Sequence, residues 1–328
     1  MKSLTYTSPI LATLAAACLV TLSLPSTAQT TWPDKPVRII VPYAPGGTTD
    51  YAARQIAQKL TEQTKQSFFV ENKTGASGTI GTDAVAKAAP DGYTLLTNDT
   101  TYAMLPSLFA KLPWDHATGL VPVTTIALTP VVLVVGAASP FKTLQELVAF
   151  AQKNPAKLNF GSGGAGSSTH LSAELFKKEG KLFITHIPYK GAGDAMLGVM
   201  SNQVDLLITA SPTAMAQVKG GKIRALAVTG DKRLAGLPDV PTFKEAGLPG
   251  YTVTNWFGLA APKGTPPDVV NKLQGEVKKA LTDSALKERF AQQGAQPGGV
   301  NPAEFSSFIR QETKTWAEAA KIAGVKPE

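Results

Sequence analysis

The chain has 328 residues, of which 43% are hydrophobic and 17% are charged, and its formal net charge is +8. This composition excludes an intrinsically disordered chain, a collagen-like repeat and a disulfide scaffold, because it supplies enough apolar residues for a core and only one cysteine. The length exceeds what a single compact core usually holds, so two lobes are expected.

The first segment differs in kind from the rest of the chain. Lys2 is its only charge, residues 10–24 are apolar, and small residues precede a cleavage point at the spacing that a signal peptidase recognises. We therefore predict that residues 1–28 are an export signal, cleaved near Ala28. Lipidation at Cys18 is the alternative, but Ala stands three places before it, where Leu, Val or Ile is usual.

The remaining sequence favours neither a membrane span nor a nucleic-acid partner. After residue 30 no apolar run of about 18 residues appears. Basic residues are scattered, and dense groups such as Lys177-Lys178 stand beside acids such as Glu179. A nucleic-acid site favours a basic stripe with stacking aromatic residues, and the sequence has neither.

The body of the chain opens with a strand, a glycine-containing loop and a helix. We predict the strand over residues 37–43 and the loop over residues 44–50. Ala53, Ile56 and Leu60 then fall on one face of a helix. Further elements are expected as a strand over 67–71, a helix over 83–88, a turn at 90–92 and a strand over 93–97.

The same pattern restarts at Pro130. Residues 131–135 predict a buried strand, and a strand over 157–160 leads into a second glycine-rich loop, 161–168. The other expected elements are helices over 143–153, 169–178, 267–282 and 302–322, and strands over 183–188, 205–209, 224–228 and 256–260.

Alternating strands and helices are typical of a mainly parallel sheet covered by helices. We predict an α/β fold of two such lobes joined by two crossover segments, because the strand over 256–260 returns to the first half. Residues 29–127 and 252–328 form lobe 1, and residues 128–251 form lobe 2.

Cofactor chemistry has little support. Gly161, Gly163 and Gly166 have the dinucleotide-binding spacing between a strand and a helix. That site also needs an acidic residue about 20 positions on, and the following strand, 184–188, has none. No phosphate-binding Gly-x-x-x-x-Gly-Lys-Ser/Thr motif occurs. We therefore expect no cofactor.

Catalytic and metal sites also lack support. The three histidines, His116, His170 and His186, are too few and too scattered for a ligand cluster. Ser167 or Ser168 stands too close in sequence to His170 to form a catalytic pair with it. Paired-carboxylate hydrolysis by Asp50 and Asp205 is not excluded by their spacing, but nothing favours it.

The two glycine loops have the pattern of anion sites. A helix amino terminus presents unpaired N-H groups and partial positive charge, so two facing helix starts can hold an anion without arginine. The same residues also suit tight turns and helix caps, but their recurrence in both halves favours the anion site. Hydroxyl groups would supplement the backbone donors at Thr48, Thr49, Ser167, Ser168 and Thr169; Tyr43, Tyr102, Tyr189 and Trp256 are candidate pocket walls, and the role of Lys190 is open.

Residues 36–50, followed by Ala53-Arg54, resemble the opening of the Bug-type periplasmic solute receptors of tripartite tricarboxylate transporters. The resemblance continues through 90–95, 161–170, 189–193 and 256–266. It implies a two-lobed, type II-like Venus-flytrap fold in the periplasm that closes on a small carboxylate and delivers it to transporter membrane subunits. A monomer without catalytic activity, metal or cofactor is expected.

The resemblance also implies the binding residues. In that family one carboxylate is held, partly through two ordered waters, by the first strand–helix loop, and the opposite lobe contributes a loop and a turn. The matching positions in lobe 1 are Tyr43, Gly46, Gly47, Thr48, Thr49 and Asp50; those in lobe 2 are Ser162, Gly163, Ser167, Ser168, Thr169, His170, Tyr189, Gly191 and Ala192, with Asp205 and Thr209 as weaker matches.

The ligand itself stays open among aliphatic di- and tricarboxylates, acidic amino acids and aromatic carboxylates. Thr48-Thr49 and the segment Asn98-Asp99-Thr100 are candidates for residues that tune selectivity. Two other functions remain as alternatives, a periplasmic enzyme that processes a carboxylate and a ligand sensor for a signalling partner.

Overall fold

A computed structural model of the chain describes residues 1–3, 32–43, 45, 48–189 and 191–327. Residues 4–28 of the predicted export signal, including Cys18, lie outside the described residues, as do Gly46, Gly47 and Lys190. The chain divides into two units, Met1–Trp32 and Pro33–Glu328, and the fold below is that of the second unit.

The first part of this unit builds one end of the sheet. Its elements are β1 (Val37–Val41), α1 (Thr48–Thr64), β2 (Phe68–Asn72), a short 3-10 turn (Ala76–Gly78), α2 (Thr79–Ala86), β3 (Thr94–Asp99) and α3 (Thr100–Leu108). Strand β1 pairs in parallel with both β2 and β3. Helix α3 was not expected from the sequence, and it starts where β3 ends because the Asp99 side chain caps it.

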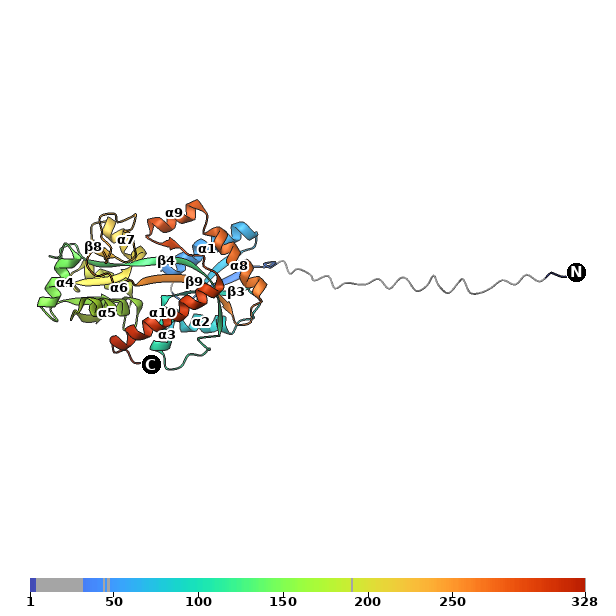
Figure 1. Cartoon of the computed structure of the whole chain (residues 1–328), viewed down its shortest axis with the longest axis horizontal. Coiled ribbons are helices and arrows are strands. Elements are labelled where there is room, and N and C mark those ends of the chain that lie inside the picture. Colours follow the sequence, from blue (N-terminus) through green and yellow to red (C-terminus); the bar gives the residue numbers. More distant parts are fainter. Residues whose placement is uncertain (4–31, 44, 46–47, 190, 328) are drawn as a thin grey trace. The chain divides into compact units, whose positions relative to one another are not determined.

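Strand β4 (Leu120–Gly136) is the longest strand and connects the two ends of the sheet. Residues from Leu120 to Pro130 pair with β9 (Thr254–Pro262), and those from Val131 onward pair with β7 and β8. The sequence predicted only residues 131–135 as strand. Figure 1 shows β4 and β9 running alongside each other, so they are the two crossover segments.

The second part of the unit builds the other end of the sheet. Its elements are α4 (Leu144–Lys153), β5 (Asn159–Ser162), α5 (Ser168–Gly180), β6 (Thr185–Pro188), α6 (Ala192–Met200), β7 (Leu206–Ala210), α7 (Ser211–Lys219) and β8 (Ile223–Val228). Strand β5 pairs in parallel with β6 and β7. After β9 come α8 (Pro267–Ala280), α9 (Ser284–Gln292), β10 (Gln296–Pro297) and α10 (Pro302–Ile322).

The strand order is β2-β1-β3-β9-β4-β7-β5-β6, with β8 and β10 also pairing with β4. The α/β class is confirmed, and the sheet is mixed rather than mainly parallel. Its two ends are parallel, whereas β9 and β4 pair antiparallel with each other and with their neighbours β3 and β7. The antiparallel pairing arises at the crossovers, because two segments of the chain that pass between the lobes in opposite directions lie side by side.

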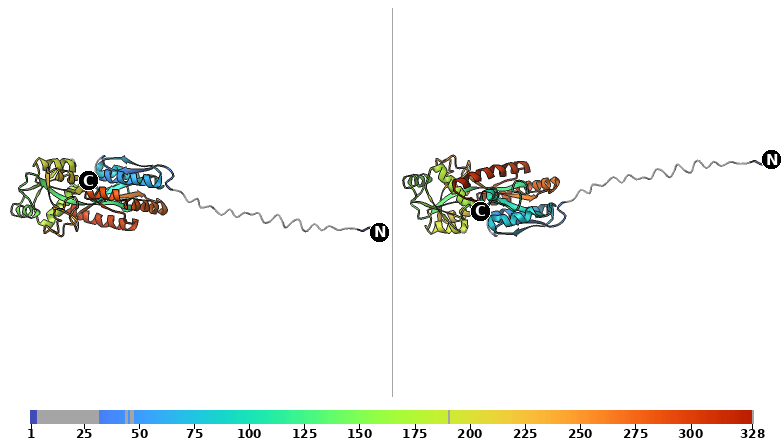
Figure 2. Two further views of the ribbon diagram at one scale, coloured as in Figure 1. Left: turned by 90° about the horizontal axis from the view of Figure 1, so that it is seen from above. Right: turned by 90° about the horizontal axis from the view of Figure 1, so that it is seen from below.

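Helix α10 packs against both α3 and α5, and therefore against elements from both ends of the sheet (Figure 2). Its residues Phe305 and Trp316 are buried in one hydrophobic cluster with Trp256 of β9. Lys178 of α5 and Glu318 of α10 form an ion pair with 2.6 Å between Nζ and Oε1. This ion pair is exposed, so the apolar contacts supply most of the attachment.

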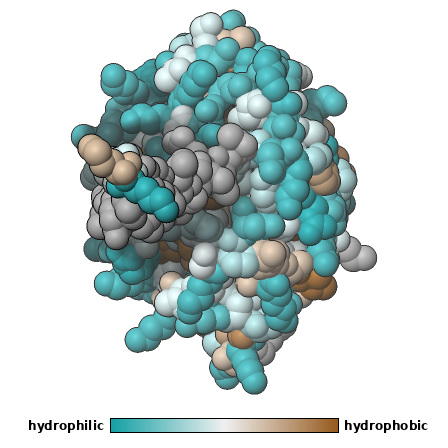
Figure 3. Space-filling model, turned by 90° about the vertical axis from the view of Figure 1, so that its right-hand side faces the viewer, coloured by the Kyte–Doolittle hydropathy of each residue, from teal (hydrophilic) through white to brown (hydrophobic). Residues whose placement is uncertain are grey.

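Hydrophilic side chains dominate the described surface on the face drawn in Figure 3, where apolar side chains lie in small separate groups. Within the described residues, none of the helices combines the length and the apolar character that a membrane span needs. The apolar residues are instead concentrated in clusters on both sides of the sheet.

Candidate functional site

A cavity of about 610 Å³ is lined by the amino-terminal turns of five helices. Thr48 and Thr49 begin α1, Thr100 and Thr101 begin α3, and Ser168 and Thr169 begin α5; Ala192 and Gly193 begin α6, and Pro212 and Thr213 lie in the first turn of α7. The first two helices follow strands at one end of the sheet, and the other three follow strands at the other end. The cavity therefore lies between the two ends of the sheet.

The structure brings part of the predicted site together here. Among the predicted residues, those that line the cavity are Tyr43, Thr48, Thr49, Ser168, Thr169, Ala192 and the weaker match Thr209. Sequence reasoning missed Tyr51, Asn255, Phe257 and Gln293, and it gave Asp99 only as a residue that tunes selectivity. These residues come from segments that are far apart in the sequence, so no local pattern predicts that they share one wall.

Two helices offer uncapped backbone donors to the cavity. In the described part of the chain, no side chain caps the first N-H groups of α6 or α7, whose N-cap residues are Gly191 and Ala210. Helix α5 differs, because the Ser167 side chain accepts the N-H of His170. An anion is therefore stabilised most at the amino termini of α6 and α7, where backbone N-H groups have no side-chain partner among the described residues.

The predicted residues of the second glycine loop hold its shape. The backbone N-H of Gly163 donates to Thr169 Oγ1 over 2.7 Å, and Ser167 Oγ donates to the carbonyl of Gly164 over 2.7 Å. Ser162 Oγ lies 2.6 Å from Nε2 of His186. Ser162, Gly163 and Ser167 are not among the residues that line the cavity. Their contact with a ligand stays a prediction.

Two histidines that are distant in sequence stack beneath this loop. The ring centroids of His170 and His186 are 3.8 Å apart, so the expectation that the histidines are scattered is wrong for this pair. Nδ1 of His170 accepts the N-H of Gly166 over 3.0 Å, which assigns its proton to Nε2. Burial lowers the pKa of both histidines to about 4, so both rings are neutral near pH 7. No metal-binding group of three side chains occurs within the residues described.

Asp50 is held by protein side chains and does not line the cavity. Its carboxylate accepts two hydrogen bonds from Arg54, each of 2.9 Å, and a third of 2.9 Å from Nδ2 of Asn72. Asn72 Nδ2 also lies 3.0 Å from the carbonyl of Tyr43. Asp50 therefore connects the start of α1 to the end of β2. Its direct contact with a ligand remains a prediction.

We expect Asp50→Ala to lower the free energy of unfolding by about 1–3 kcal/mol, because the side chain is 4% exposed and holds three charge-assisted bonds. Urea unfolding of the ligand-free chain measures the loss. The matched control is Glu71→Ala, which removes an acid that is 44% exposed and paired with Arg38, and costs about 0–1 kcal/mol. Equal losses in the two variants would contradict the structural role of Asp50.

Asp99 lies at the end of β3 and lines the cavity with only 9% of its surface exposed. It accepts hydrogen bonds from Tyr43 Oη (3.0 Å), Thr49 Oγ1 (2.7 Å) and the N-H of Thr101 (2.9 Å). Burial raises the pKa of Asp99, and the three donors oppose that rise by stabilising the carboxylate. In the described lining no lysine, arginine or histidine faces it.

The other predicted residues lie outside this cavity. Asp205 precedes β7, and its Oδ2 accepts the N-H of Asn159 over 2.8 Å. His170 lies beneath the glycine loop, and Gly191 is the N-cap of α6. Tyr102 and Trp256, suggested as pocket walls, are buried in the hydrophobic core, and Phe257 next to Trp256 lines the cavity instead.

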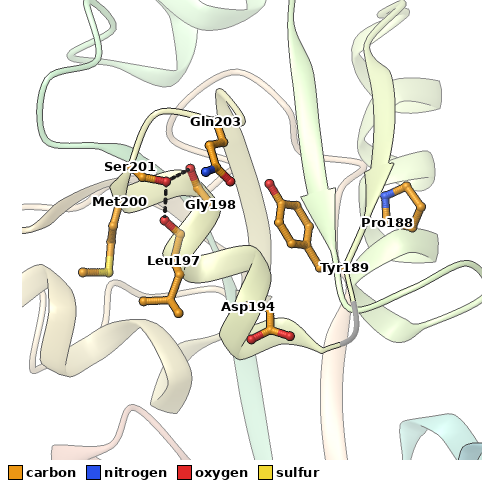
Figure 4. Close-up of a pocket in the computed structure, with 8 residues that line it drawn as sticks. All are labelled: Pro188, Tyr189, Asp194, Leu197, Gly198, Met200, Ser201 and Gln203. Atoms are coloured by element: carbon orange, nitrogen blue, oxygen red, sulfur yellow. Dashed lines mark hydrogen bonds between the residues drawn. The ribbon is translucent and has the colours of Figure 1, made fainter.

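Tyr189 belongs to a second cavity, of about 820 Å³, between β6 and α6. Figure 4 shows its ring between the strand and the helix, with the hydroxyl toward Gly198. A Cβ atom at Gly198 would come within 2.4 Å of that hydroxyl, so the glycine makes room for the ring. Leu197 and Met200 also line this cavity, which gives it an apolar wall. The predicted ligand contact of Tyr189 stays a prediction.

The chain is similar to a family of known receptors. Residues 52–324 match the family described as "Tripartite tricarboxylate transporter family receptor". Protein BugT of Bordetella pertussis is 37% identical over 298 residues, which cover 90% of this chain and 91% of that protein.

Two solved structures share the fold. A protein of R. palustris with adipate has a TM-score of 0.83 and 36% identity, and the match covers 90% of this chain and 100% of that one. MatC from Rhodopseudomonas palustris with bound malate has a TM-score of 0.77 and 33% identity, over 88% and 99% of the two chains.

Proposed function

The chain belongs to the tripartite tricarboxylate transporter receptor family, and from this premise we propose that it is a periplasmic receptor that captures a small carboxylate between its two lobes. The observation that carries the proposal is the cavity lined by five helix amino termini. Backbone N-H groups and helix dipoles favour an anion there, and no described lysine, arginine or histidine lines the wall. The related structures with adipate and malate support the carboxylate class.

Backbone donors alone supply enough energy for useful affinity. A hydrogen bond to a charged group contributes roughly 1.5–3 kcal/mol, and a partly buried helix dipole contributes up to ~2 kcal/mol. Micromolar binding needs about 8 kcal/mol. Two donors from α6, the N-H of Thr213 from α7, where Pro212 has no N-H, and the dipoles of both helices reach that value after the cost of ordering the ligand.

The lobe boundaries that we propose follow the strand pairing. Lobe 1 comprises residues 29–127 and 252–328, and lobe 2 comprises residues 128–251. The register supports a division close to this one, because β4 changes partner from β9 to β7 and β8 between Pro130 and Val131, shortly after the proposed boundary. A ligand that contacts both lobes favours the closed form, and the two antiparallel crossovers are suited to act as the hinge.

We further propose that the receptor is an exported monomer that hands its ligand to the membrane subunits of the transporter and does not transform it. The signal-like residues 1–28 support export, with cleavage near Ala28. The receptor role of the family supports the transport partner and argues against an enzyme. Turnover of a bound carboxylate by the purified chain would contradict this part of the proposal.

A thermal-shift screen tests the function. We expect at least one small carboxylate to raise the melting temperature, since a one-site ligand at roughly a hundredfold excess over Kd stabilises the fold by about 2.7 kcal/mol. Small-angle scattering with that ligand should then show a smaller radius of gyration. Inorganic sulfate and an uncharged amide of the same acid are the controls. If no member of a broad carboxylate panel shifts the melting temperature, the proposal is wrong.

A further inference from the structure

The hydroxyl groups that were expected to bind a carboxylate in lobe 1 already donate to Asp99. Tyr43 Oη lies 3.0 Å from Oδ1 of Asp99, and Thr49 Oγ1 lies 2.7 Å from Oδ2. A hydroxyl group has one hydrogen to donate. These two hydroxyl groups can therefore only accept hydrogen bonds from a ligand, through their lone pairs. The Thr101 N-H at the start of α3 is also used, because it donates to Asp99 over 2.9 Å.

A second acceptor lies beside Asp99 on the same wall. Phe257 of β9 is the cross-strand partner of Asp99, and Asn255 lies two residues away on the same face of β9. Oδ1 of Asn255 is a buried atom with no hydrogen-bond partner among the described residues. A buried acceptor without a donor is costly, so a ligand that donates a hydrogen bond gains there.

The two walls of the cavity therefore differ in chemistry. Helices α6 and α7 present uncapped N-H groups from one end of the sheet. At the other end Asp99 and Asn255 present acceptors beside the first turn of α1, which also lines the cavity. Arg289 of α9 interacts electrostatically with the hydroxyl group of Tyr51, but Arg289 itself does not line the cavity. A ligand that carries negative charge at both ends meets the Asp99 carboxylate with no described cation between them.

We propose that Asp99 selects ligands that carry a protonated amino group as well as a carboxylate, so that the substrate class is the amino carboxylates rather than plain di- or tricarboxylates. The carboxylate binds at the amino termini of α6 and α7, and the ammonium group donates to Asp99 and Asn255. Asp99 is therefore a specificity-determining residue. This inference rests on the proposed receptor function and narrows its ligand.

Matched pairs of acids test the inference on the wild-type chain. Calorimetric titration at pH 7.5 compares aspartate with succinate, 2-aminoadipate with adipate, and 4-(aminomethyl)benzoate with 4-methylbenzoate. We expect the amino member of at least one pair to bind about tenfold tighter or more, a difference of about 1.4 kcal/mol, and no plain member to bind tighter than its partner. A preference for the plain acids overturns the inference and leaves the carboxylate receptor intact. Binding by neither member of any pair, while another plain carboxylate of the thermal-shift panel binds, also overturns the inference alone; failure of the whole panel overturns the proposed function and this inference with it.

Substitution of Asp99 tests whether direct contact sets the preference. Asp99→Asn removes the charge and keeps an oxygen that caps α3. We expect the amino preference to fall to within about threefold. The control is Asp268→Asn, which removes an exposed acid that lies in the first turn of α8 and does not line the cavity. Loss of the preference in both variants, or retention in Asp99→Asn with an unchanged melting temperature, overturns the role of Asp99. Should Asp99→Asn not fold, the wild-type pairs alone decide.

Discussion

Gly163→Val is expected to lower the affinity for the best ligand of the carboxylate screen at least a hundredfold. A Cβ atom at Gly163 would lie 2.9 Å from the backbone N of Ala192 and 3.2 Å from the carbonyl carbon of Gly191. These contacts are with backbone at the start of α6, so no side chain can rotate away to relieve them. The amino terminus of α6 must instead move away from the loop that precedes α5.

The movement removes donors from the cavity. Ala192 and Gly193 line it, and the first N-H groups of α6 are among its uncapped donors. Loss of two hydrogen bonds to a charged group, at roughly 1.5 kcal/mol each, corresponds to more than a hundredfold in Kd. Overpacking at a backbone contact also lowers the free energy of unfolding, by about 1–3 kcal/mol. Calorimetric titration and urea unfolding measure the two effects separately.

Gly275→Val is the matched control. Gly275 is an exposed residue inside α8, and a Cβ atom there meets nothing within 4 Å. Valine at this position keeps the affinity and leaves stability equal or slightly higher, because glycine is the poorer helix former. Unchanged affinity in Gly163→Val, with the fold retained, would show that α6 does not contribute donors to the ligand.

The parts of the fold that could be predicted from the sequence are those with a local signal. The helix over 302–322 was predicted with its observed bounds, because Asn301 and Glu304 form a capping box and Pro302 occupies the first turn. Thr143 and Glu146 mark the start of α4 in the same way. Residues 131–135, and residues 225–228 of the strand predicted over 224–228, are runs of buried apolar residues.

The missed elements are stabilised by tertiary contacts rather than by local pattern. The first part of β4 contains Pro122 and Pro130 and the buried polar residues Thr124 and Thr125, and it is a strand because β9 pairs with it. Helix α3 contains Pro106 and follows β3 without a loop. Its burial against α10 offsets the poor local propensity.

The candidate site was predictable where one loop carries it and not where distant segments meet. Thr48, Thr49, Ser168 and Thr169 precede or begin helices after glycine loops, and they line the cavity. Asn255 and Phe257 give no such signal, because they line it only through the pairing of β9 with β3 and β4. The binding role given to Asp50 could not be judged from the sequence, because the three bonds that engage its carboxylate depend on packing.

Acidification is expected to destabilise the chain between pH 6.5 and about 4. His170 is buried and His116 and His186 are half-buried, and burial lowers the pKa of each from 6.5 to about 4. Within this window the unfolded chain binds more protons than the folded chain, so stability is lost as the pH falls. A shift of this size corresponds to about 3 kcal/mol for a fully buried group, and less for His186, which is the least buried.

Two buried carboxyl groups act in the opposite direction. Burial raises the pKa of Asp99 and of Glu312, so these groups bind protons more readily in the folded chain. Their contribution to stability grows as the pH falls through those raised pKa values. The three histidines outnumber them and titrate from a higher pH. Urea unfolding at pH 7.5, 6.5, 5.5 and 4.5 should therefore show a steady loss of stability.

The stacked pair of His170 and His186 connects the loss of stability at low pH to the candidate binding site. Protonation of His170 at Nδ1 breaks the hydrogen bond from Gly166, and Glu174 and Lys177 oppose each other in their effect on the charge of the pair. His170→Asn keeps an acceptor near the position of Nδ1 but cannot take up a proton. We expect this variant to bind ligand at pH 4 about twofold better than the wild-type chain, because about half of the wild-type His170 is protonated there, with equal affinity at pH 7.5.

His116→Gln is the control for this experiment. His116 stacks on Tyr102, with 4.4 Å between the ring centroids, and does not line the cavity. Its removal should lessen the acid destabilisation without changing how ligand affinity depends on pH. If His170→Asn and the wild-type chain lose affinity in parallel between pH 7.5 and pH 4, the histidine pair does not control the glycine loop, and titration of Asp99 or of the ligand accounts for the loss.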